Sequence, residues 1–334
     1  MKSFIAIFRA RNKEYYRDKG SLSWAFILPI LIITACAVAF SNPDQSVFSV
    51  GTVNQSSADS SEQDWLHQNF IKSHEYANFN SARKRIEHHQ LDLLIDFQTN
   101  TYWTNPQSSR GAAAALLFNQ QFKGFTAERF DGDAIRYVDW VIPGVLGMNL
   151  MFGALFGVGY VIVRYRRNGV LKRLKATPVS AFEFLSAQLV SRLVIVVGAA
   201  AIIFIGCDLV LDLIVVGSYF SLLLVTTIGA LAMIAIGLLI SSRTSNEELA
   251  GGLLNFATWP MLFLSEVWFP LDEAPQWMRS LAELMPLTHI VKANRAIMLD
   301  GASLADVSYH LVWLIAITLI AILAAARLFR WTKN

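Results

Sequence analysis

Six long apolar runs alternate with more polar segments along the chain. At about 1.5 Å of rise per helical residue, runs of this length can cross a hydrocarbon core of about 30 Å. The runs cover residues 22–40, 137–163, 184–206, 217–241, 249–269 and 310–326. The pattern therefore predicts a polytopic α-helical membrane protein with six transmembrane helices.

Residues 1–21 precede the first run and mix basic and apolar positions at helical spacing. The apolar side chains that fall roughly on one helical face are Phe4, Ile5, Phe8, Tyr15 and Tyr16. We therefore expect an amphipathic helix that lies on the cytoplasmic surface of the membrane. Residues 22–40 are longer than the apolar core of a secretory signal and lack a clear cleavage pattern, so we expect a retained first span.

Residues 41–136 lose the long apolar runs and show short patterns of both kinds. Alternating or continuous apolar stretches predict strands at 47–53, 91–97 and 101–104, and helical spacing predicts helices at 60–73, 81–89 and 109–122. A segment of this length can bury a small core of its own. We expect an external α/β domain between spans 1 and 2, which gates an exit, contacts a second copy or docks an external partner.

Residues 270–299, between spans 5 and 6, are too broken by proline for one continuous helix. The prolines in and before this segment are Pro260, Pro270, Pro275 and Pro286. Trp268, Phe269 and Trp277 suit a membrane–water interface. We therefore expect short re-entrant helices that enter and leave the outer leaflet.

The basic residues indicate which loops are cytoplasmic. Residues 1–20 and 164–183 hold six basic residues each, whereas the short loop 207–216 holds none. Because basic residues concentrate in short cytoplasmic loops, both termini and residues 164–178 are predicted to be cytoplasmic. The 41–136 segment is left out of the count, because large loops cross the membrane regardless of charge.

The composition excludes several other functions. The net charge of +3 is small and follows from membrane topology, so it does not indicate a nucleic-acid partner. Cys36 and Cys207 lie in or beside apolar runs and are expected to be buried thiols. The histidines of the 41–136 segment lack the spacing of a metal site; they are His67, His74, His88 and His89. The sequence contains no Gly-x-x-x-x-Gly-Lys-Ser/Thr phosphate loop.

Basic residues that only set the membrane topology would not need a regular spacing of apolar residues, yet the segment 164–178 shows one. It carries six cations and no acid, and Val170, Leu171 and Leu174 recur at helical spacing. The proline of Thr177-Pro178 disfavours further helix, because the residue before a proline is pushed out of the helical region. We expect a short basic helix that faces the cytoplasm.

A few residues within the spans attract attention. Asn149 and Asn255 are polar at a depth where an unpaired side chain is costly. For Glu266 we favour a carboxylate in interfacial water over one that faces a cation or an exit cavity. For Arg192 we favour snorkelling or pairing over substrate binding. The small-xxx-small pattern Gly153–Gly157 permits close helix approach, either within the bundle or between subunits.

Two motifs of this sequence resemble motifs in the permease subunits of type-2 ABC exporters, which move drugs, lipids and polysaccharides. One is Arg-Arg-Asn-Gly-Val-Leu-Lys-Arg-Leu-Lys-Ala-Thr-Pro at 166–178. The other combines Phe-Pro-Leu-Asp-Glu-Ala-Pro-Gln-Trp-Met at 269–278 with Met-Pro-Leu-Thr-His at 285–289. The order of the spans and the large domain after the first span are similar too, so the resemblance covers nearly the whole chain.

The resemblance implies that 166–178 includes a coupling helix, which docks on a separate cytosolic ATPase subunit. That subunit, not this chain, would bind ATP and Mg²⁺. The implied contact residues are Arg166, Arg167, Gly169, Leu171, Lys172, Arg173, Leu174, Thr177 and Pro178. Many relatives carry an acidic residue just before the glycine, where this chain has Arg166, Arg167 and Asn168, and this departure affects the detailed contacts.

The resemblance also implies a dimer, of identical or related permeases, with substrate passing between spans 2 and 5 of the two copies. The implied lining positions are Asn149, Met151, Phe152, Asn255, Trp259, Phe263 and Glu266. For any single aromatic or methionine among them, ordinary core packing is the commoner role. Membrane lipids and a periplasmic adaptor are further expected partners.

Three functional hypotheses follow. The first is an export permease, in a bacterial plasma membrane, for an amphipathic or apolar cargo, with lipid-linked polysaccharide as the alternative cargo. The second is a membrane-anchored sensor or assembly protein whose external domain binds a ligand. The third, an ion-coupled transporter, normally needs ionisable groups at mid-membrane depth, which the spans almost lack.

Overall fold

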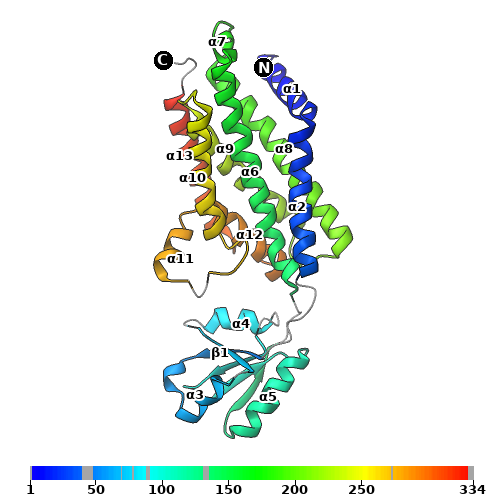
Figure 1. Cartoon of the computed structure of the whole chain (residues 1–334), viewed down its shortest axis with the longest axis vertical. Coiled ribbons are helices and arrows are strands. Elements are labelled where there is room, and N and C mark those ends of the chain that lie inside the picture. Colours follow the sequence, from blue (N-terminus) through cyan, green and yellow to red (C-terminus); the bar gives the residue numbers. More distant parts are fainter. Residues whose placement is uncertain are drawn as a thin grey trace. The chain divides into compact units, whose positions relative to one another are not determined.

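A computed structural model describes residues 2–39, 48–68, 70–76, 79–87, 91–130, 135–271 and 274–329. The chain folds into two compact units (Figure 1). One unit joins Met1–Ala39 to Tyr137–Asn334 and is helical, and the other is Phe40–Arg136, which contains the described sheet. The described structure is mostly helical, which is consistent with the expected α-helical polytopic membrane protein.

The helical unit contains ten described helices. They are α1 (Lys2–Arg17), α2 (Lys19–Ala39), α6 (Tyr137–Arg167), α7 (Val170–Lys175), α8 (Ala181–Leu211), α9 (Tyr219–Ser241), α10 (Glu247–Leu264), α11 (Gln276–Ala282), α12 (Pro286–Asp300) and α13 (Ser308–Leu328). Among the described residues, four helices are long and apolar enough to span a membrane: α6, Phe182–Leu211 of α8, α9 and α13. α2 contains a shorter apolar stretch, Ala25–Cys36, and α10 occupies the place of the fifth expected span. The count of six spans therefore stays a prediction.

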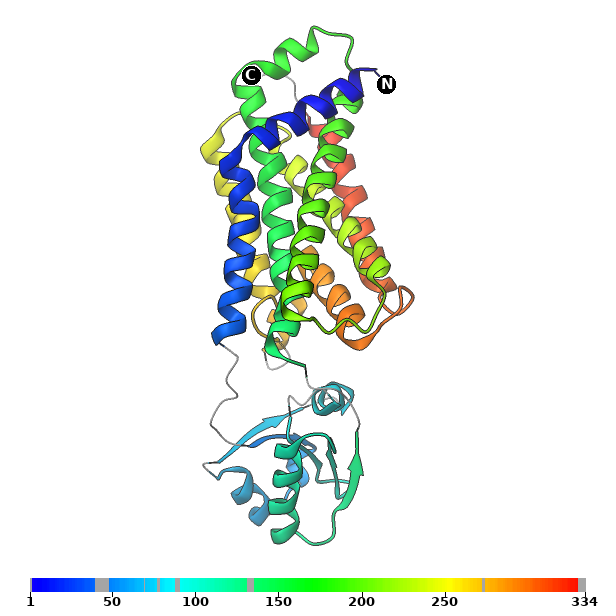
Figure 2. The ribbon, with the colours of Figure 1, turned by 90° about the vertical axis from the view of Figure 1, so that its right-hand side faces the viewer.

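Helix α9 is central in the helical unit. It packs against α6, α8, α12 and α13, and α1 packs against α8. Figure 2 shows α1 running obliquely across one end of the bundle, while α2 runs along its length. The last turn of α6 and helix α7 lie at this same end, and α11 and α12 lie at the opposite end (Figure 1).

The basic segment 164–178 is divided between two helices. Residues 164–167 form the last turn of α6, and α7 begins only after Gly169, which has the left-handed φ of 71° that favours glycine. α7 ends at Lys175, before Thr177-Pro178. The next helix, α8, begins with a capping box formed by Ser180 and Glu183. The sequence thus sets both ends of α7.

Gly144 in α6 allows a close backbone approach. A Cβ atom at this position would lie 2.6 Å from the carbonyl oxygen of Val267 and 2.9 Å from its Cα atom. We expect Gly144→Ala to lower the free energy of unfolding by about 1–3 kcal/mol, because backbone cannot yield as a side chain can. Gly198→Ala is the matched control, since nothing lies within 4 Å of its Cβ position. Thermal unfolding in detergent tests this, and equal unfolding temperatures for the two variants would refute it.

The α/β unit holds a five-stranded sheet in the order β2-β1-β3-β4-β5. The strands are β1 (Phe48–Val53), β2 (Ile71–Glu75), β3 (Leu93–Asp96), β4 (Thr101–Thr104) and β5 (Thr126–Arg129). Only the β3–β4 pair is antiparallel among the described pairs. One core joins α3 (Ser60–Leu66) and α5 (Ser109–Gln121) to the sheet, and a second joins α4 (Phe79–Glu87) to it.

Two expectations for this unit were wrong in detail. Residues 71–73, expected at the end of a helix, instead begin strand β2, and β5 was not expected at all. Both are edge strands, and β5 is exposed at every position, so neither shows the apolar alternation of a half-buried strand. The expected absence of a metal site stays a prediction for the whole unit, because His88 and His89 lie outside the described residues.

Candidate functional site

Helix α7 presents a basic surface at one end of the helical unit. We define the α7 surface by its exposed side chains, which are Lys172, Arg173, Lys175, Thr177 and Pro178. Leu174 is partly buried, whereas Leu171 is fully buried inside this chain. The expectation that Leu171 docks on a partner is therefore corrected: its side chain anchors α7 to its own protein.

Arg166 is also an internal residue and not a partner contact. Its side chain is 4% exposed and donates hydrogen bonds to the carbonyl oxygens of Ser241 and Ser242, each at 2.8 Å, and to that of Thr244. These carbonyls belong to the end of α9 and the turn that follows it, where helical carbonyls lack intrahelical partners. The neighbouring Arg167 is exposed and pairs with Glu247 at 2.6 Å. Arg166 thus ties the end of α6 to the end of α9.

Glu14 of α1 joins that helix to the same end of α6. Its carboxylate accepts hydrogen bonds from Arg11 and Arg164, each at 2.9 Å, and from the hydroxyl of Tyr165. Burial alone would raise the pKa of Glu14, but the Tyr165 hydrogen bond and the two guanidinium charges together lower the pKa below its ordinary value of 4.5. The carboxylate therefore stays ionised near neutral pH and holds α1 against α6.

A cavity of about 570 Å³ lies beside Glu14; we call it the polar cavity. Residues of α1, α2, α6 and α8, with Glu247 of α10, line it. Its charged lining consists of Arg11, Glu14, Asp18, Arg164, Arg192 and Glu247. Its aromatic lining includes Phe152, Phe156 and Tyr160 from one face of α6. Asn149 and Phe152, two of the expected pathway residues, line this cavity.

Arg192 of α8 reaches into the polar cavity and contacts α6. Its Nε donates a hydrogen bond at 2.6 Å to the carbonyl oxygen of Gly153, which also accepts from Nη2, and the guanidinium lies 5.3 Å from the ring centre of Tyr15. A Cβ atom at Gly157 would lie 1.9 Å from Cζ of Arg192. The Gly153–Gly157 pattern therefore accommodates this buried guanidinium within the bundle.

The remaining expected pathway residues lie elsewhere. Asn255, Trp259 and Phe263 are exposed along α10, and Nδ2 of Asn255 donates to the carbonyl oxygen of Gly251 in its own helix. Met151 is fully buried in the core. The structure thus brings only Asn149 and Phe152 of the expected set to the polar cavity.

Glu266 follows α10 and has the left-handed φ of 53°. Its carboxylate lies 3.5 Å from Lys292 Nζ and 3.5 Å from Arg295 Nη1, and its side chain is 14% exposed. Lys292 also pairs with Glu283 at 2.6 Å. The expectation of a carboxylate in interfacial water is therefore corrected: Glu266 belongs to an ion cluster that fixes the chain after α10 onto α12.

A histidine pair that no sequence pattern indicates joins α12 to α13. Nδ1 of His289 lies 2.8 Å from Nδ1 of His310, and Nε2 of His289 lies 2.9 Å from the carbonyl oxygen of Glu283. Since a carbonyl only accepts, Nε2 of His289 carries the hydrogen. In the neutral pair, Nδ1 of His289 therefore accepts from His310.

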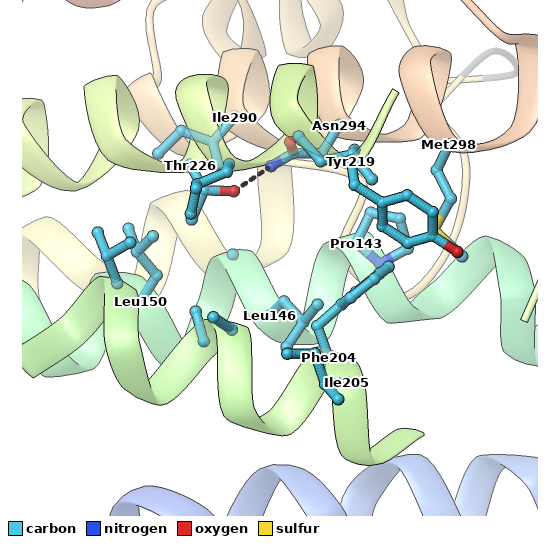
Figure 3. A pocket seen from close by; sticks show the side chains of 16 residues that line it. Pro143, Leu146, Leu150, Phe204, Ile205, Tyr219, Thr226, Ile290, Asn294 and Met298 are labelled. Carbon is cyan, nitrogen blue, oxygen red and sulfur yellow. Dashed lines mark hydrogen bonds between the residues drawn. The ribbon is translucent and has the colours of Figure 1, made fainter. Parts of the chain in front are cut away.

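A second cavity, of about 210 Å³, lies at the α11–α12 end of the bundle between α6, α8, α9 and α12 (Figure 3). We call it the apolar cavity because nearly all its lining is hydrocarbon. Its polar edge is Asn294, whose Nδ2 donates to Thr226 Oγ1 at 3.4 Å. Its Oδ1 has no hydrogen-bond partner in the described part of the chain.

Comparison with known proteins identifies the class. The family model for ABC-2 type transporters matches residues 89–299. The probable multidrug ABC transporter permease YbhR of Escherichia coli strain K12 is 25% identical over 197 residues, which cover 59% of this chain and 53% of YbhR. ABC transporter G family member 20 of Dictyostelium discoideum is 24% identical over 260 residues, which cover 74% of this chain and 36% of that protein.

The linearmycin resistance permease protein LnrN of Bacillus subtilis strain 168 is 28% identical over 166 residues, covering 48% of this chain and 42% of LnrN. The chain thus spans about half the length of the bacterial relatives it matches. The family match covers well over half of the chain and includes the last turn of α6, α7 and the ion cluster around Glu266. The chain therefore belongs to the ABC-2 type transporter family, as a membrane permease of the type-2 ABC class.

Proposed function

We propose that this chain is the permease subunit of an ATP-driven exporter in a bacterial plasma membrane. It pairs with a second permease copy and with a separate cytosolic ATPase, which binds ATP and Mg²⁺. Both termini and α7 face the cytoplasm, and the α/β unit and α11–α12 face outward. The cargo is amphipathic or apolar, in keeping with relatives named for multidrug transport and linearmycin resistance.

The α7 surface carries this proposal. Lys172, Arg173 and Lys175 lie exposed on one short helix at the end of the helical unit. Their charges suit the aqueous cytoplasmic side of the membrane and not its hydrocarbon core. The buried Leu171 and the Gly169 turn hold that helix in place. A fixed, solvent-facing basic helix suits docking onto an acidic groove of a soluble subunit.

Coupling would act through the contacts of Arg166. When the ATPase subunits close on ATP, they move α7, and the Arg166 hydrogen bonds carry that movement to the end of α9. The spans then rock as rigid bodies between inward-open and outward-open states. The polar cavity, at the same end as α7, is the inward-facing part of the pathway.

The second permease copy would pack against α10. Large apolar side chains along this helix are exposed in the single chain; they are Leu249, Leu253, Phe256, Trp259 and Phe263. Either lipid or a second copy can cover them, and Asn255 among them favours a protein or wet pathway over pure hydrocarbon. We assign this face to the dimer and its pathway.

The proposal is tested by co-purification. The chain is captured from detergent-solubilised native membranes, and ATP hydrolysis by the captured material is measured. We expect the wild-type chain to retain an ATPase and the variant Lys172→Glu with Arg173→Glu to lose most of it, because reversed charges repel an acidic groove. The matched control, Arg9→Glu with Lys13→Glu, makes the same charge change on exposed positions of α1 and is expected to keep the ATPase.

Failure of the wild-type chain to retain any ATPase would overturn the proposal. The membrane-anchored sensor hypothesis would then be favoured, because it needs no ATPase. Equal retention by both double variants would leave the exporter in place but remove the α7 surface as its docking site.

A further inference from the structure

The polar cavity contains a buried cation that pairs with no carboxylate among the residues that the structure describes. Arg192 is 8% exposed, and in the described part of the chain its polar partners are the carbonyl oxygen of Gly153 and the ring of Tyr15. Placing a charge in a protein interior is costly unless an opposite charge or several hydrogen bonds compensate it. An anion is the compensation that a guanidinium favours most.

We propose that the polar cavity binds the anionic headgroup of an amphiphile, a phosphate or carboxylate, with Arg192 as the binding cation. The inference rests on the proposed function, because it names the chemical class of cargo or lipid that the inward-facing pathway admits. It reverses the expectation that Arg192 only snorkels or pairs.

The other two cations of the lining, Arg11 and Arg164, share the carboxylate of Glu14. Glu247 pairs with Arg167. Asp18, the remaining carboxylate of the lining, forms no ion pair with Arg192. Arg192 is therefore the positive charge of the lining that a ligand can neutralise.

The guanidinium is held in a fixed orientation. Of its five N–H groups, one on Nε and one on Nη2 bond to Gly153, which leaves three for another acceptor. The missing side chain of Gly157 lets the guanidinium lie flat against α6. Arg192 lies about 16 Å along α8 from its first residue, so its charge is well inside the span and not at its end. Such a group can bind a planar carboxylate or a phosphate through two hydrogen bonds.

The cavity also offers an apolar surface for the rest of the ligand. Phe152, Phe156 and Tyr160 follow one another at four-residue spacing on α6, with ring centres 5.7 and 5.6 Å apart. Leu28 of α2 also lines the cavity. A volume of about 570 Å³ is within the usual range of small-molecule sites. An inorganic anion would contact Arg192 but not the aromatic side chains of α6. An amphiphile can contact both, through its headgroup and its apolar chain.

Binding is measured on the full-length chain in phosphatidylcholine nanodiscs, without nucleotide or ATPase, by calorimetric titration with empty nanodiscs as background. The probes are dodecyl phosphate, dodecyltrimethylammonium and inorganic phosphate. We expect dodecyl phosphate to bind the wild type at least about tenfold more tightly than it binds Arg192→Gln. Dodecyltrimethylammonium is expected to show no such difference, and inorganic phosphate is expected to bind at least about tenfold more weakly than dodecyl phosphate.

Three variants control the measurement. Lys13→Gln removes an exposed cation of α1 and is expected to bind as the wild type does. Arg192→Lys keeps the charge and should keep the preference for phosphate over ammonium. If Arg192→Gln does not fold, Phe156→Ala serves instead. This variant should bind dodecyl phosphate more weakly than the wild type does, and it should still prefer dodecyl phosphate to dodecyltrimethylammonium.

The source of the headgroup is then decided by adding phosphatidylglycerol to the nanodisc. Competition with dodecyl phosphate assigns the site to a membrane lipid, and lack of competition assigns it to a soluble amphiphile; both support an anionic amphiphile. Equal affinity of wild type and Arg192→Gln for dodecyl phosphate would overturn the proposal, as would inorganic phosphate binding as tightly as dodecyl phosphate. Because no ATPase is present, the result is independent of the co-purification test.

Discussion

Arg166→Met is expected to lower the free energy of unfolding by about 3–5 kcal/mol. The guanidinium donates to the carbonyl oxygens of Ser241, Ser242 and Thr244, and methionine keeps the bulk of the side chain but none of its donors. The carbonyls at the end of α9 then lose partners in a place that water reaches poorly. Thermal unfolding of the purified chain in detergent should show a decrease on the order of 5 °C or more.

Arg167→Met is the matched control, because it makes the same chemical change at the next residue. Arg167 is 62% exposed, and its single ion pair with Glu247 is open to water. Exposed ion pairs contribute about 0–1 kcal/mol, so this variant should unfold close to the wild-type temperature. Equal destabilisation by both variants would mean that net charge, and not the Arg166 hydrogen bonds, stabilises this end of the bundle.

Leu171→Asp is expected to destabilise the chain by several kcal/mol, with a loss of folded protein from membranes. The leucine is a fully buried residue of α7, so the variant places a carboxylate at a position closed to water. The yield of monodisperse protein after size-exclusion chromatography measures the effect. Because the protein itself fails, a loss of ATPase from this variant would say nothing about docking.

Leu174→Asp separates the two roles that a leucine in α7 can have. Leu174 is only partly buried, so its substitution should leave most of the protein folded. Normal yield for Leu171→Asp with loss of the ATPase would contradict the internal position of Leu171. It would restore the interpretation in which both leucines dock on the partner.

The pattern of segment 164–178 predicted a short basic helix and its end correctly, but not which of its residues are accessible. An apolar face on a helix indicates that its side chains are buried. It does not indicate whether they are buried by the same chain or by a partner. Likewise, the sequence alone does not distinguish the neighbouring arginines Arg166 and Arg167. Their roles differ because the carbonyls that bind Arg166 come from residues more than 70 positions away.

Residue type alone did not place the expected pathway positions. Asn149 and Phe152 line the polar cavity, although core packing is the commoner role for an aromatic, and their part in a pathway stays a prediction. Glu266 was misjudged because its partners, Lys292 and Arg295, lie in a helix beyond a proline-broken segment whose path cannot be read from the pattern. For the α/β unit, central strands were predictable from buried runs, whereas the exposed edge strands were not.

The contacts of Gly153 and Gly157 constrain how α6 can move. Arg192 of α8 bonds to the Gly153 carbonyl, and Arg11 of α1 bonds to the Gly157 carbonyl at 3.2 Å, one helical turn further along the same face. A rotation of α6 about its own axis by even one residue, about 100°, would carry both carbonyls away from their guanidiniums together. Rolling or screw-like motion of α6 is therefore blocked at two points at once, whereas tilting α1, α6 and α8 as one block breaks neither bond.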